Sequence, residues 1–519
     1  MRKGKKILAL FLALLVVISI AGCSSPTGNE KQTAAPATPT AMDTATKQAD
    51  VVVVGSGMAG MSAAIEAASQ GAKVILLEKM GVLGGSTNHA EGMFASESPL
   101  QKKLGITVNT EELLREEFNF SNYRVDGNLW KDVMKHSGED IQWLLDMGVK
   151  FETVTSTGAG AKTWHVYEGF GEKVINAYMK PKAEKLGVEI LLETPAKELI
   201  MKDGQVAGVK ATTKDGKELA ISAKAVVLAT GGFGNNEQMV KEFTHATKEK
   251  YVDRGAPGHT GDGINMAKAA GALTGERAIV MQLGNTLESS FITTHINAAA
   301  GMEPSLWVNQ DGKRFCNEDV IWYYTRGSNA IMSQYKTFTV LDSNEVKRLA
   351  TEGATVGYGM YVTPGTKLDK LEAELQKAVA DKAPDVFKAD TIEELAAKMG
   401  VDKANFVETV NTYNAFCANG KDLDYGKNPK YLHAVKTGPF YGFRVKANNL
   451  TSCGGIRINE NCEALNKDYQ PIKGLYVAGM DCDGFTGDTY GLTIPGSAQG
   501  YSCYTGRTSG KNAAQYAKQ

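Results

Sequence analysis

Three glycines near the start of the chain, Gly55, Gly57 and Gly60, have the spacing of a dinucleotide-binding turn. They follow four valines at 51–54, which predict a buried parallel strand, and precede residues 61–69, which predict a helix. The first glycine permits a tight turn, the second lets the backbone approach a pyrophosphate, and the third lets the helix pack on the strand. The free N–H groups at the start of such a helix suit a phosphate.

A carboxylate completes this unit. Glu78 follows residues 73–77, which predict a second strand, and a carboxylate at that point can hold a ribose hydroxyl. The alternative is a plain glycine turn, which does not account for the strands, the helix and the acid together.

Several later segments combine glycines with small or acidic residues. At 84–87 and 90–92, glycines and small hydroxyls let backbone approach a flat ligand. An apolar strand predicted over 225–230 runs into a pair of glycines. At 258–267 a tight turn leads into a helix, with Asp262 at its start, where the helix dipole favours a carboxylate. The alternative for Asp262 is a helix cap without a ligand.

Aromatic and cationic side chains later in the chain are candidates for proton transfer. Tyr324 lies in an aromatic cluster at 322–324 that Arg326 follows, and Tyr490 lies in a glycine- and acid-rich loop. A phenol or a guanidinium beside a polarised double bond can donate a proton or hydrogen-bond a carbonyl. The alternative is that both tyrosines are packing residues and that Arg326 makes a surface ion pair.

The elements that position these residues predict an α/β protein with more than one domain. A length of 519 residues favours two or three domains, and a formal net charge of −1 argues against nucleic acid as a partner. A strand at 188–192 and a β-meander at 199–222 precede the strand at 225–230. Between about 281 and 435 the glycine motifs stop and charged amphipathic helices appear from 368 to about 418. We interpret this stretch as an inserted α+β cap domain, flanked by two parts of one nucleotide-binding domain at 49–280 and 436–519. Strands are predicted at 438–445, 454–458 and 475–479 in the second part.

The N-terminal residues predict a targeting signal. Basic residues at 2–6 and an apolar run at 7–20 end at Cys23 in a segment that resembles a bacterial lipobox. The resemblance implies a signal peptide over 1–22, lipidation of Cys23, a flexible polar tether over 23–48, and a lipid-anchored protein on the outer face of the cell membrane. The alternatives are a plain signal peptide and an uncleaved anchor. The remaining six cysteines show no CxxC spacing, so we expect no c-type haem or zinc site and favour buried free thiols over disulfides.

Taken in order, the motifs resemble one family of flavoproteins. VVVVGSGMAG, GGST, ATGG, TGDG, DGKRFCNE and LYVAG are similar to the motifs of the FAD-dependent fumarate reductase and 3-ketosteroid dehydrogenase group. The resemblance covers nearly all of the chain after about residue 50. It implies FAD in a Rossmann-type domain built from both ends of the chain, with the cap domain closing over the flavin.

The resemblance also implies which residues hold FAD. In the expected roles, Glu78 takes the adenosine ribose, Gly92 lines the phosphate–ribityl side, and Ser497 and Ala498 present backbone N–H groups to the flavin. Met480 replaces the acid of the usual AGE motif, and Asp481 is its expected substitute. The full expected set is Gly55, Gly57, Ala59, Gly60, Glu78, Lys79, Gly85, Ser86, Thr87, Gly92, Ala196, Thr230, Gly231, Asp262, Gly479, Asp481, Ser497 and Ala498.

The departures from the family bear on the substrate. Fumarate reductases of this group carry a histidine pair where this chain has residues 450–455 (LTSCGG) and an arginine where it has 492–497 (LTIPGS). A threonine–glutamate pair ahead of the LWVN strand is also missing. Since a dicarboxylate needs cationic partners, these losses argue against fumarate. The aromatic cluster favours a flatter, less charged substrate such as an aryl-acrylate or an enone.

We therefore hypothesise the reduction of an activated C=C bond. Hydride would pass from N5 of the reduced flavin, Arg326 or Tyr324 would supply the proton, and Tyr490 would hydrogen-bond the substrate carbonyl. Two alternatives stay open: a dehydrogenase of a steroid-like ketone, and a surface lipoprotein that binds a flavin or a nutrient without catalysis. The chain shows no haem motif, flavinylation motif or second nicotinamide fingerprint, so we expect an extracytoplasmic electron-donor protein as partner.

Overall fold

The structure is a computed structural model that describes residues 45–157, 160–244, 246–275 and 278–519. The expected signal peptide, Cys23 and the expected tether up to residue 44 lie outside the described residues. Among the described residues, no helix is long and apolar enough to cross a membrane.

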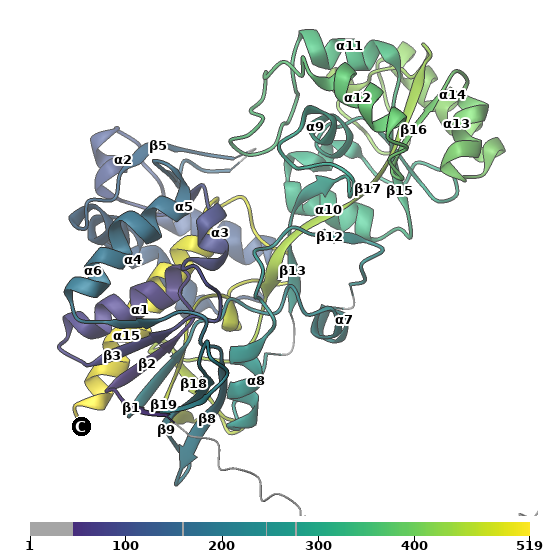
Figure 1. The fold of residues 1–519 in the computed structure, drawn as a ribbon. Coiled ribbons are helices and arrows are strands. Elements are labelled where there is room, and N and C mark those ends of the chain that lie inside the picture. Colours follow the sequence, from purple (N-terminus) through teal and green to yellow (C-terminus); the bar gives the residue numbers. More distant parts are fainter. Residues whose placement is uncertain (1–44, 158–159, 245, 276–277) are drawn as a thin grey trace, which may run out of the picture. The chain divides into compact units, whose positions relative to one another are not determined.

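A six-stranded sheet forms the centre of the nucleotide-binding part (Figure 1). Its order is β18–β19–β11–β2–β3–β7, with all neighbours parallel except β18 and β19. The strands are β2 (Val51–Val54), β3 (Val74–Leu77), β7 (Glu189–Leu191), β11 (Ala225–Leu228), β18 (Glu463–Leu465) and β19 (Pro471–Val477). Every residue of β2, β3 and β11 is buried, which is why these strands read as continuous apolar runs. Strands from both ends of the chain therefore share one sheet, as the sequence predicts.

Two helices from opposite ends of the chain lie side by side against this sheet. Helix α1 (Met58–Ser69) follows the glycine turn, and α15 (Ser497–Ala517) ends the chain (Figure 1). Their backbones approach closely: a Cβ on Gly506 would lie 2.3 Å from the carbonyl oxygen of Ala59. The small residues of both helices permit this contact.

A second, four-stranded sheet has the order β1–β10–β9–β8. Strands β8 (Ala196–Lys202), β9 (Gln205–Thr212) and β10 (Glu218–Ser222) form the predicted meander. Strand β1 (Ala45–Gln48) pairs in parallel with β10. The expected tether is thus wrong for its last four residues. Their side chains are all exposed, so backbone pairing with a sheet edge, and not an apolar pattern, places them.

The long strand β17 (Phe440–Cys453) connects the nucleotide-binding part with the inserted segment. It pairs with strands that come from well-separated parts of the chain: β12 (Tyr251–Asp253), β13 (Ile279–Thr286), β15 (Thr337–Leu341) and β16 (Val386–Ala389). Strand β14 (Leu306–Asn309) pairs with β15. Residues 454–458 make only isolated bridges, so the strand predicted there is wrong, and β17 ends at Cys453 instead.

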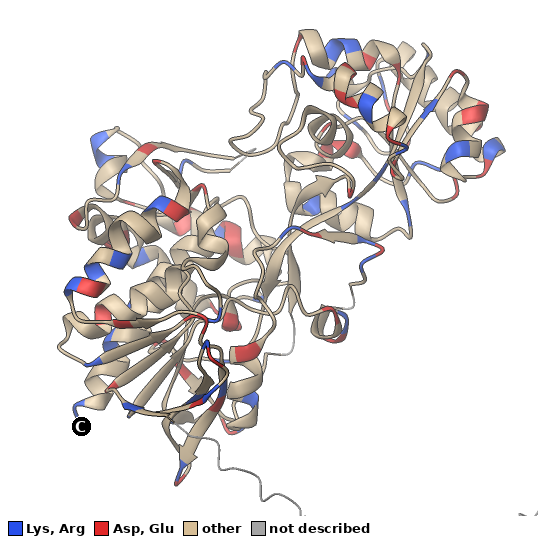
Figure 2. Cartoon of the chain, in the orientation of Figure 1, with Lys and Arg blue, Asp and Glu red and all other residues tan. Residues whose placement is uncertain are grey.

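Helices surround this mixed sheet. They are α9 (His295–Gly301), α10 (Tyr324–Met332), α11 (Ser343–Thr351), α12 (Leu371–Ala380), α13 (Ile392–Met399), α14 (Lys403–Asn419) and the 3₁₀ helices η3 (Glu318–Trp322) and η4 (Pro429–Tyr431). Figure 2 shows both charge signs interspersed over α12, α13 and α14, in agreement with the predicted charged helices. Leu306, Phe338 and Phe406 belong to a separate hydrophobic cluster here. Since residues 43–519 group as one compact unit, the domain boundaries at 280 and 435 stay predictions.

The remaining elements lie in the nucleotide-binding part. They are the strands β4 (Gly92–Phe94), β5 (Phe151–Thr155) and β6 (Trp164–Tyr167), which form one small sheet, and the helices η1 (Gly85–His89), α2 (Pro99–Lys103), α3 (Thr110–Phe120), α4 (Gly127–Asp146), α5 (Phe170–Lys173), η2 (Val174–Met179), α6 (Lys180–Lys185), α7 (Glu237–Thr244), α8 (Asp262–Ala269) and η5 (Gly479–Asp481). The six cysteines of the described part are free thiols; Cys453, Cys462, Cys482 and Cys503 are buried, whereas Cys316 and Cys417 are partly exposed.

Candidate active site

A first site lies at the carboxyl ends of β2, β3, β11 and β19 and encloses about 880 Å³ including its open mouth. We call it the main cavity. Ligands of open parallel sheets bind at this end of the strands. The structure brings together thirteen of the expected cofactor residues around it: Gly55, Gly57, Ala59, Glu78, Lys79, Gly85, Ser86, Thr87, Ala196, Thr230, Gly231, Asp262 and Gly479.

The start of α1 faces the main cavity without a side-chain cap. Gly55 has φ +102°, and a Cβ on it would lie 2.2 Å from the carbonyl oxygen of Ala229, so only glycine fits this turn. The backbone N–H of Met58 donates to Thr87 Oγ1 at 2.9 Å. The other N–H groups of the first turn have no side-chain partner among the described residues, which fits a bound pyrophosphate.

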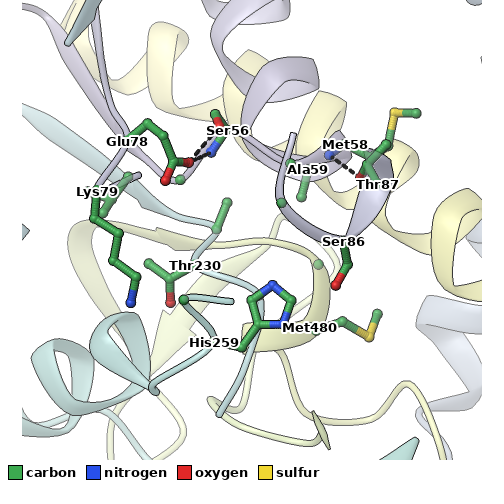
Figure 3. A pocket seen from close by; sticks show the side chains of 18 of the residues that line it. Ser56, Met58, Ala59, Glu78, Lys79, Ser86, Thr87, Thr230, His259 and Met480 are labelled. Atoms are coloured by element: carbon green, nitrogen blue, oxygen red, sulfur yellow. Dashed lines mark hydrogen bonds between the residues drawn. The ribbon is translucent and has the colours of Figure 1, made fainter. Parts of the chain in front are cut away.

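Glu78 lies at one end of the main cavity (Figure 3). Its carboxylate accepts hydrogen bonds from Ser56 Oγ at 2.5 Å and from the backbone N–H of Met80 at 2.8 Å. These donors hold the carboxylate against the glycine turn, in a position that suits a ribose hydroxyl.

Lys79 and Asp262 form an ion pair at the rim. Lys79 Nζ lies 2.7 Å from Asp262 Oδ2 and 2.7 Å from Thr260 Oγ1. The pair ties the end of β3 to the start of α8. The Asp262 carboxylate thus already has protein partners, which indicates that it helps to hold the rim of the main cavity together.

His259 was missing from the predicted set, although it stands in the same GHTGDG motif as Asp262. Its ring lies against Gly231 and reaches Thr451 Oγ1 with Nδ1 at 3.3 Å. Burial lowers its pKa to about 4, so the imidazole is neutral at neutral pH. Figure 3 shows His259 with Ser86 and Met480 on the side of the main cavity away from Glu78. The signal available in the sequence was a histidine between two nearby glycines, Gly258 and Gly261.

Five predicted cofactor residues do not line the main cavity. Gly60 packs against Gly55, and Gly92 is a buried residue of β4 whose added Cβ would lie 2.3 Å from the carbonyl oxygen of His165. The Asp481 carboxylate is buried and accepts hydrogen bonds from the backbone N–H groups of Thr230 and Gly232, while Met480 faces the cavity. Gly92 thus packs against β6 and Asp481 holds the loop at 230–232, and the ligand roles expected of both stay predictions.

Ser497 and Ala498 are the remaining two, and both meet Tyr490. The Tyr490 hydroxyl lies 3.4 Å from Ser497 Oγ and accepts from the backbone N–H of Ala498. Tyr490 is buried and lines neither the main cavity nor the second site described below. Its phenol thus holds the start of α15. These contacts do not indicate the expected hydrogen bond from Tyr490 to a substrate carbonyl.

A second, narrower site lies between α3, α10 and the segment before α15. It encloses about 300 Å³ including its open mouth, of which about 10 Å³ admits the centre of a water-sized sphere. We call it the inner hollow. Its described lining residues are Phe120, Thr157, Gly160, Trp322, Tyr323, Tyr324, Thr325, Leu492 and Thr493. None of them is charged, and four are aromatic. The chain continues from Leu492 into α15, whose residues Gln499 and Ser502 line the main cavity.

Several residues that line the inner hollow carry buried polar atoms that have no hydrogen-bond partner in the described part of the chain. Among these atoms are Trp322 Nε1, Thr325 Oγ1 and Thr157 Oγ1. Because an unpaired buried donor or acceptor is costly, such groups indicate a ligand that pairs with them.

Tyr324 begins α10 and connects the inner hollow with a loop of the inserted segment. Its side chain is 7% exposed, and its hydroxyl accepts from the backbone N–H of Gly359 at 3.3 Å. Burial raises the pKa of this phenol to about 12, so it carries its proton at neutral pH. A buried phenol whose oxygen already accepts a hydrogen bond can give up its proton to a neighbouring ligand.

Arg326, the expected first choice of proton donor, is exposed. Its guanidinium carbon lies 4.5 Å from the Phe120 ring centroid and 4.7 Å from that of Tyr323. It lines an open outer hollow together with Glu112, Arg115 and Glu116. The structure does not bring Arg326 to the inner hollow, because two aromatic rings hold its charge on the solvent side.

FAD fits the main cavity on these observations. The uncapped start of α1, the close-packed glycine turn and the carboxylate of Glu78 suit its pyrophosphate and ribose. The segment that leads into α15 connects the two sites, because Leu492 and Thr493 line the inner hollow and Gln499 and Ser502 line the main cavity.

Comparisons with known proteins agree with this arrangement. The family model described as "FAD binding domain" matches residues 50–491. Over 478 residues the chain is 42% identical to a vinyl phenol reductase of Lactiplantibacillus plantarum, covering 91% of this chain and 97% of that protein. It is 30% identical to a fumarate reductase (cytochrome) of Shewanella frigidimarina, covering 90% of this chain and 77% of that protein.

A solved structure shows the same mixed α/β fold. The 3-ketosteroid Δ4-(5α)-dehydrogenase of Rhodococcus jostii RHA1 aligns with a TM-score of 0.67 and 25% identity, covering 92% of this chain and 98% of that one. The predicted fold class, an FAD-binding domain with a cap domain, is confirmed.

Proposed function

The chain belongs to the FAD-binding-domain family, and from this membership we propose that it reduces the C=C bond of an uncharged hydroxystyrene such as 4-vinylphenol. It is an FAD-dependent oxidoreductase acting on CH–CH bonds, and it reduces C=C bonds of unsaturated substrates. The non-catalytic alternative is thereby removed. The substrate class is the part that we propose.

The lining of the inner hollow carries the proposal. Phe120, Trp322 and Tyr323 offer aromatic faces, and no cationic side chain is among the described residues that line it. A dicarboxylate would lack the charged partners that it needs there. A flat, neutral ring can stack on these faces. A 42% identical relative named for vinyl phenol supports the same class.

Polar atoms in the inner hollow suit a substrate hydroxyl. Trp322 Nε1 donates only, whereas the hydroxyls of Thr157 and Thr325 both donate and accept. None of the three has a hydrogen-bond partner among the residues that the structure describes. A phenol hydroxyl can satisfy them, which would orient the ring and fix where its vinyl group lies.

Reduction of the alkene requires a hydride on one carbon and a proton on the other. When bound and reduced, FAD supplies the hydride. The Tyr324 hydroxyl supplies the proton and becomes a phenolate, which the N–H of Gly359 stabilises. Solvent then returns a proton to that oxygen. A positioned acid of this kind contributes roughly 10²–10⁴-fold to the rate.

The test is anaerobic single turnover. The flavin of the purified protein is bleached with reduced viologen, the excess is removed, and 4-vinylphenol, fumarate or 4-androstene-3,17-dione is added. We expect 4-vinylphenol to restore the flavin absorbance with one equivalent of 4-ethylphenol formed. Reoxidation of the flavin by fumarate but not by 4-vinylphenol would refute the proposal. Reaction of the oxidised protein with a saturated ketosteroid would instead support the dehydrogenase alternative.

We also propose that the protein is held on the outer face of the cell membrane by lipid on Cys23, and that an extracytoplasmic redox protein reduces it. The lipobox-like segment and the absence of a second nicotinamide fingerprint in the sequence support this. Labelled palmitate should enter the wild-type protein but not Cys23→Ala, which should leave the membrane fraction. Rapid turnover with NADH alone would contradict the need for a protein donor.

A further inference from the structure

Glu91 is a carboxylic acid that neither the main cavity nor the inner hollow uses. It lies between η1 and β4, and its carbonyl accepts from the backbone N–H of Tyr167. Its side chain turns toward a loop of the inserted segment. The carboxylate accepts a hydrogen bond from the backbone N–H of Met360. A Cβ on Gly359 would lie 3.2 Å and 3.3 Å from its two oxygens, so the carboxylate abuts this turn.

The same turn holds Tyr324. The N–H of Gly359 donates to the Tyr324 hydroxyl at 3.3 Å, and the next N–H, of Met360, donates to Glu91. Two adjacent amides thus fix the carboxyl group and the phenol oxygen beside one another. The Tyr324 ring also stacks on Tyr358, with 6.2 Å between centroids and an interplanar angle of 8°. Tyr358 is itself anchored by Asn448 Nδ2, 2.5 Å from its hydroxyl.

We propose that Glu91 is a positioning residue for Tyr324: it anchors the Gly359–Met360 turn, and its charge state controls how readily the phenol gives up its proton. The inference rests on the proposed function, in which Tyr324 is the proton donor. It assigns the carboxylate a role that no motif of the sequence indicates.

A negative charge on Glu91 can only disfavour a phenolate on Tyr324. The titratable groups that face Glu91 are the phenols of Tyr324 on α10 and of Tyr358 and Tyr361 on the loop. Burial raises the pKa of all three, so they are protonated and uncharged at neutral pH. Burial raises the pKa of Glu91 to about 7. Below that pH the carboxyl group is neutral and does not oppose phenolate formation. Above it, the negative charge opposes a phenolate on Tyr324, so the proton is given up more slowly.

The experiment measures flavin reoxidation by 4-vinylphenol in stopped flow from pH 5.5 to 9, with pre-reduced wild type, Glu91→Gln and Glu172→Gln. The glutamine variant keeps the hydrogen-bond acceptor and cannot ionise. Glu172 is an exposed carboxylate on α5 and serves as the matched control. We expect the wild-type and control rate constants to fall above pH 7 by at most about tenfold, the effect of one pKa unit on a proton donor. We expect the Glu91→Gln rate constant to change less than about twofold over the same range.

The result that overturns the inference is a Glu91→Gln profile parallel to that of the wild type, whether at equal or uniformly lower rates. If Glu91→Gln does not fold, Gly359→Ala provides the second variant, because its Cβ presses on the carboxylate. We expect that variant to shift the alkaline limb, and an unshifted limb counts against the inference. Tyr324→Phe separates the two proposals: full activity in that variant removes Tyr324 as donor, whereas lost activity with an unchanged Glu91→Gln profile refutes the role of Glu91 alone.

Discussion

Glu117 offers a sharp test of the electrostatics of the interior. It lies on α3, is 1% exposed, and neither of its carboxylate oxygens has a hydrogen-bond partner in the described structure. Its Oε2 lies 2.7 Å from where a Cβ on Gly491 would stand, beside Tyr490. We predict that Glu117→Gln stabilises the protein, and that the gain increases with pH.

The magnitude follows from the pKa. Burial, with the nearby charge of Glu116, raises the pKa of Glu117 from 4.5 to about 8. The folded state therefore binds this proton more tightly than the unfolded state, and the free energy of unfolding falls as pH rises from 4.5 to 8. At about 1.4 kcal/mol per pKa unit, the loss is about 3 kcal/mol at pH 7 and about 5 kcal/mol above pH 8. Glutamine avoids this loss because it stays neutral.

Thermal unfolding of the FAD-loaded proteins measures the effect. A chain of this size has an unfolding entropy of about 1 kcal/mol/K, so the Tm of Glu117→Gln should exceed that of the wild type by about 3–5 °C at pH 8 and by about 1 °C or less at pH 5. Glu112→Gln changes an exposed carboxylate on the same helix and should show no such trend. A Tm difference that is equal at pH 5 and pH 8 would refute the reasoning.

Three further predictions concern the proposed site and its support. Tyr324→Phe should lower the rate of flavin reoxidation by 4-vinylphenol by about 10² or more with FAD still bound, and a change under threefold would remove Tyr324 as donor. Arg326→Ala should keep that rate within about twofold, because two rings hold its guanidinium outside the inner hollow, whereas a loss as large as that of Tyr324→Phe would restore it as the proton donor. Asp422→Asn should destabilise the protein by about 3–5 kcal/mol, read as a lower Tm, because Asp422 accepts two hydrogen bonds of 2.8 Å from the buried Arg314; an unchanged Tm would contradict this.

The sequence indicated most of the residues that line the main cavity because local patterns determine where they lie. Gly55 needs a backbone with positive φ, Gly60 has no room for a Cβ, and Glu78 follows a strand whose place is set by its apolar residues. Ser86, Thr87 and Asp262 come from segments whose glycines already indicated contact with a ligand. Such residues are recognisable in one sequence because their role depends on neighbours a few positions away.

The residues that sequence reasoning missed or misassigned depend on contacts between distant segments. Arg326 and Tyr324 are two positions apart, and only the packing of α10 against Phe120 decides which of them faces inward. The sequence predicts Asp481 as a cofactor ligand, but its carboxylate accepts hydrogen bonds from the backbone N–H groups of Thr230 and Gly232. His259 contacts Thr451 of β17, and Glu91 contacts the loop at 357–361; both partners lie far along the chain. The DGKRFCNE motif likewise proved structural, since Arg314 and Glu318 form a buried ion pair at 2.7 Å.

The central claim is that the inner hollow selects a neutral aromatic alkene over a dicarboxylate. It is tested most directly by the ratio of second-order rate constants for reoxidation of the reduced flavin by 4-vinylphenol and by fumarate. Because two carboxylates would lack cationic partners in the inner hollow, at about 1–3 kcal/mol each, we predict a ratio of about 10² or more. A ratio below one would contradict the account.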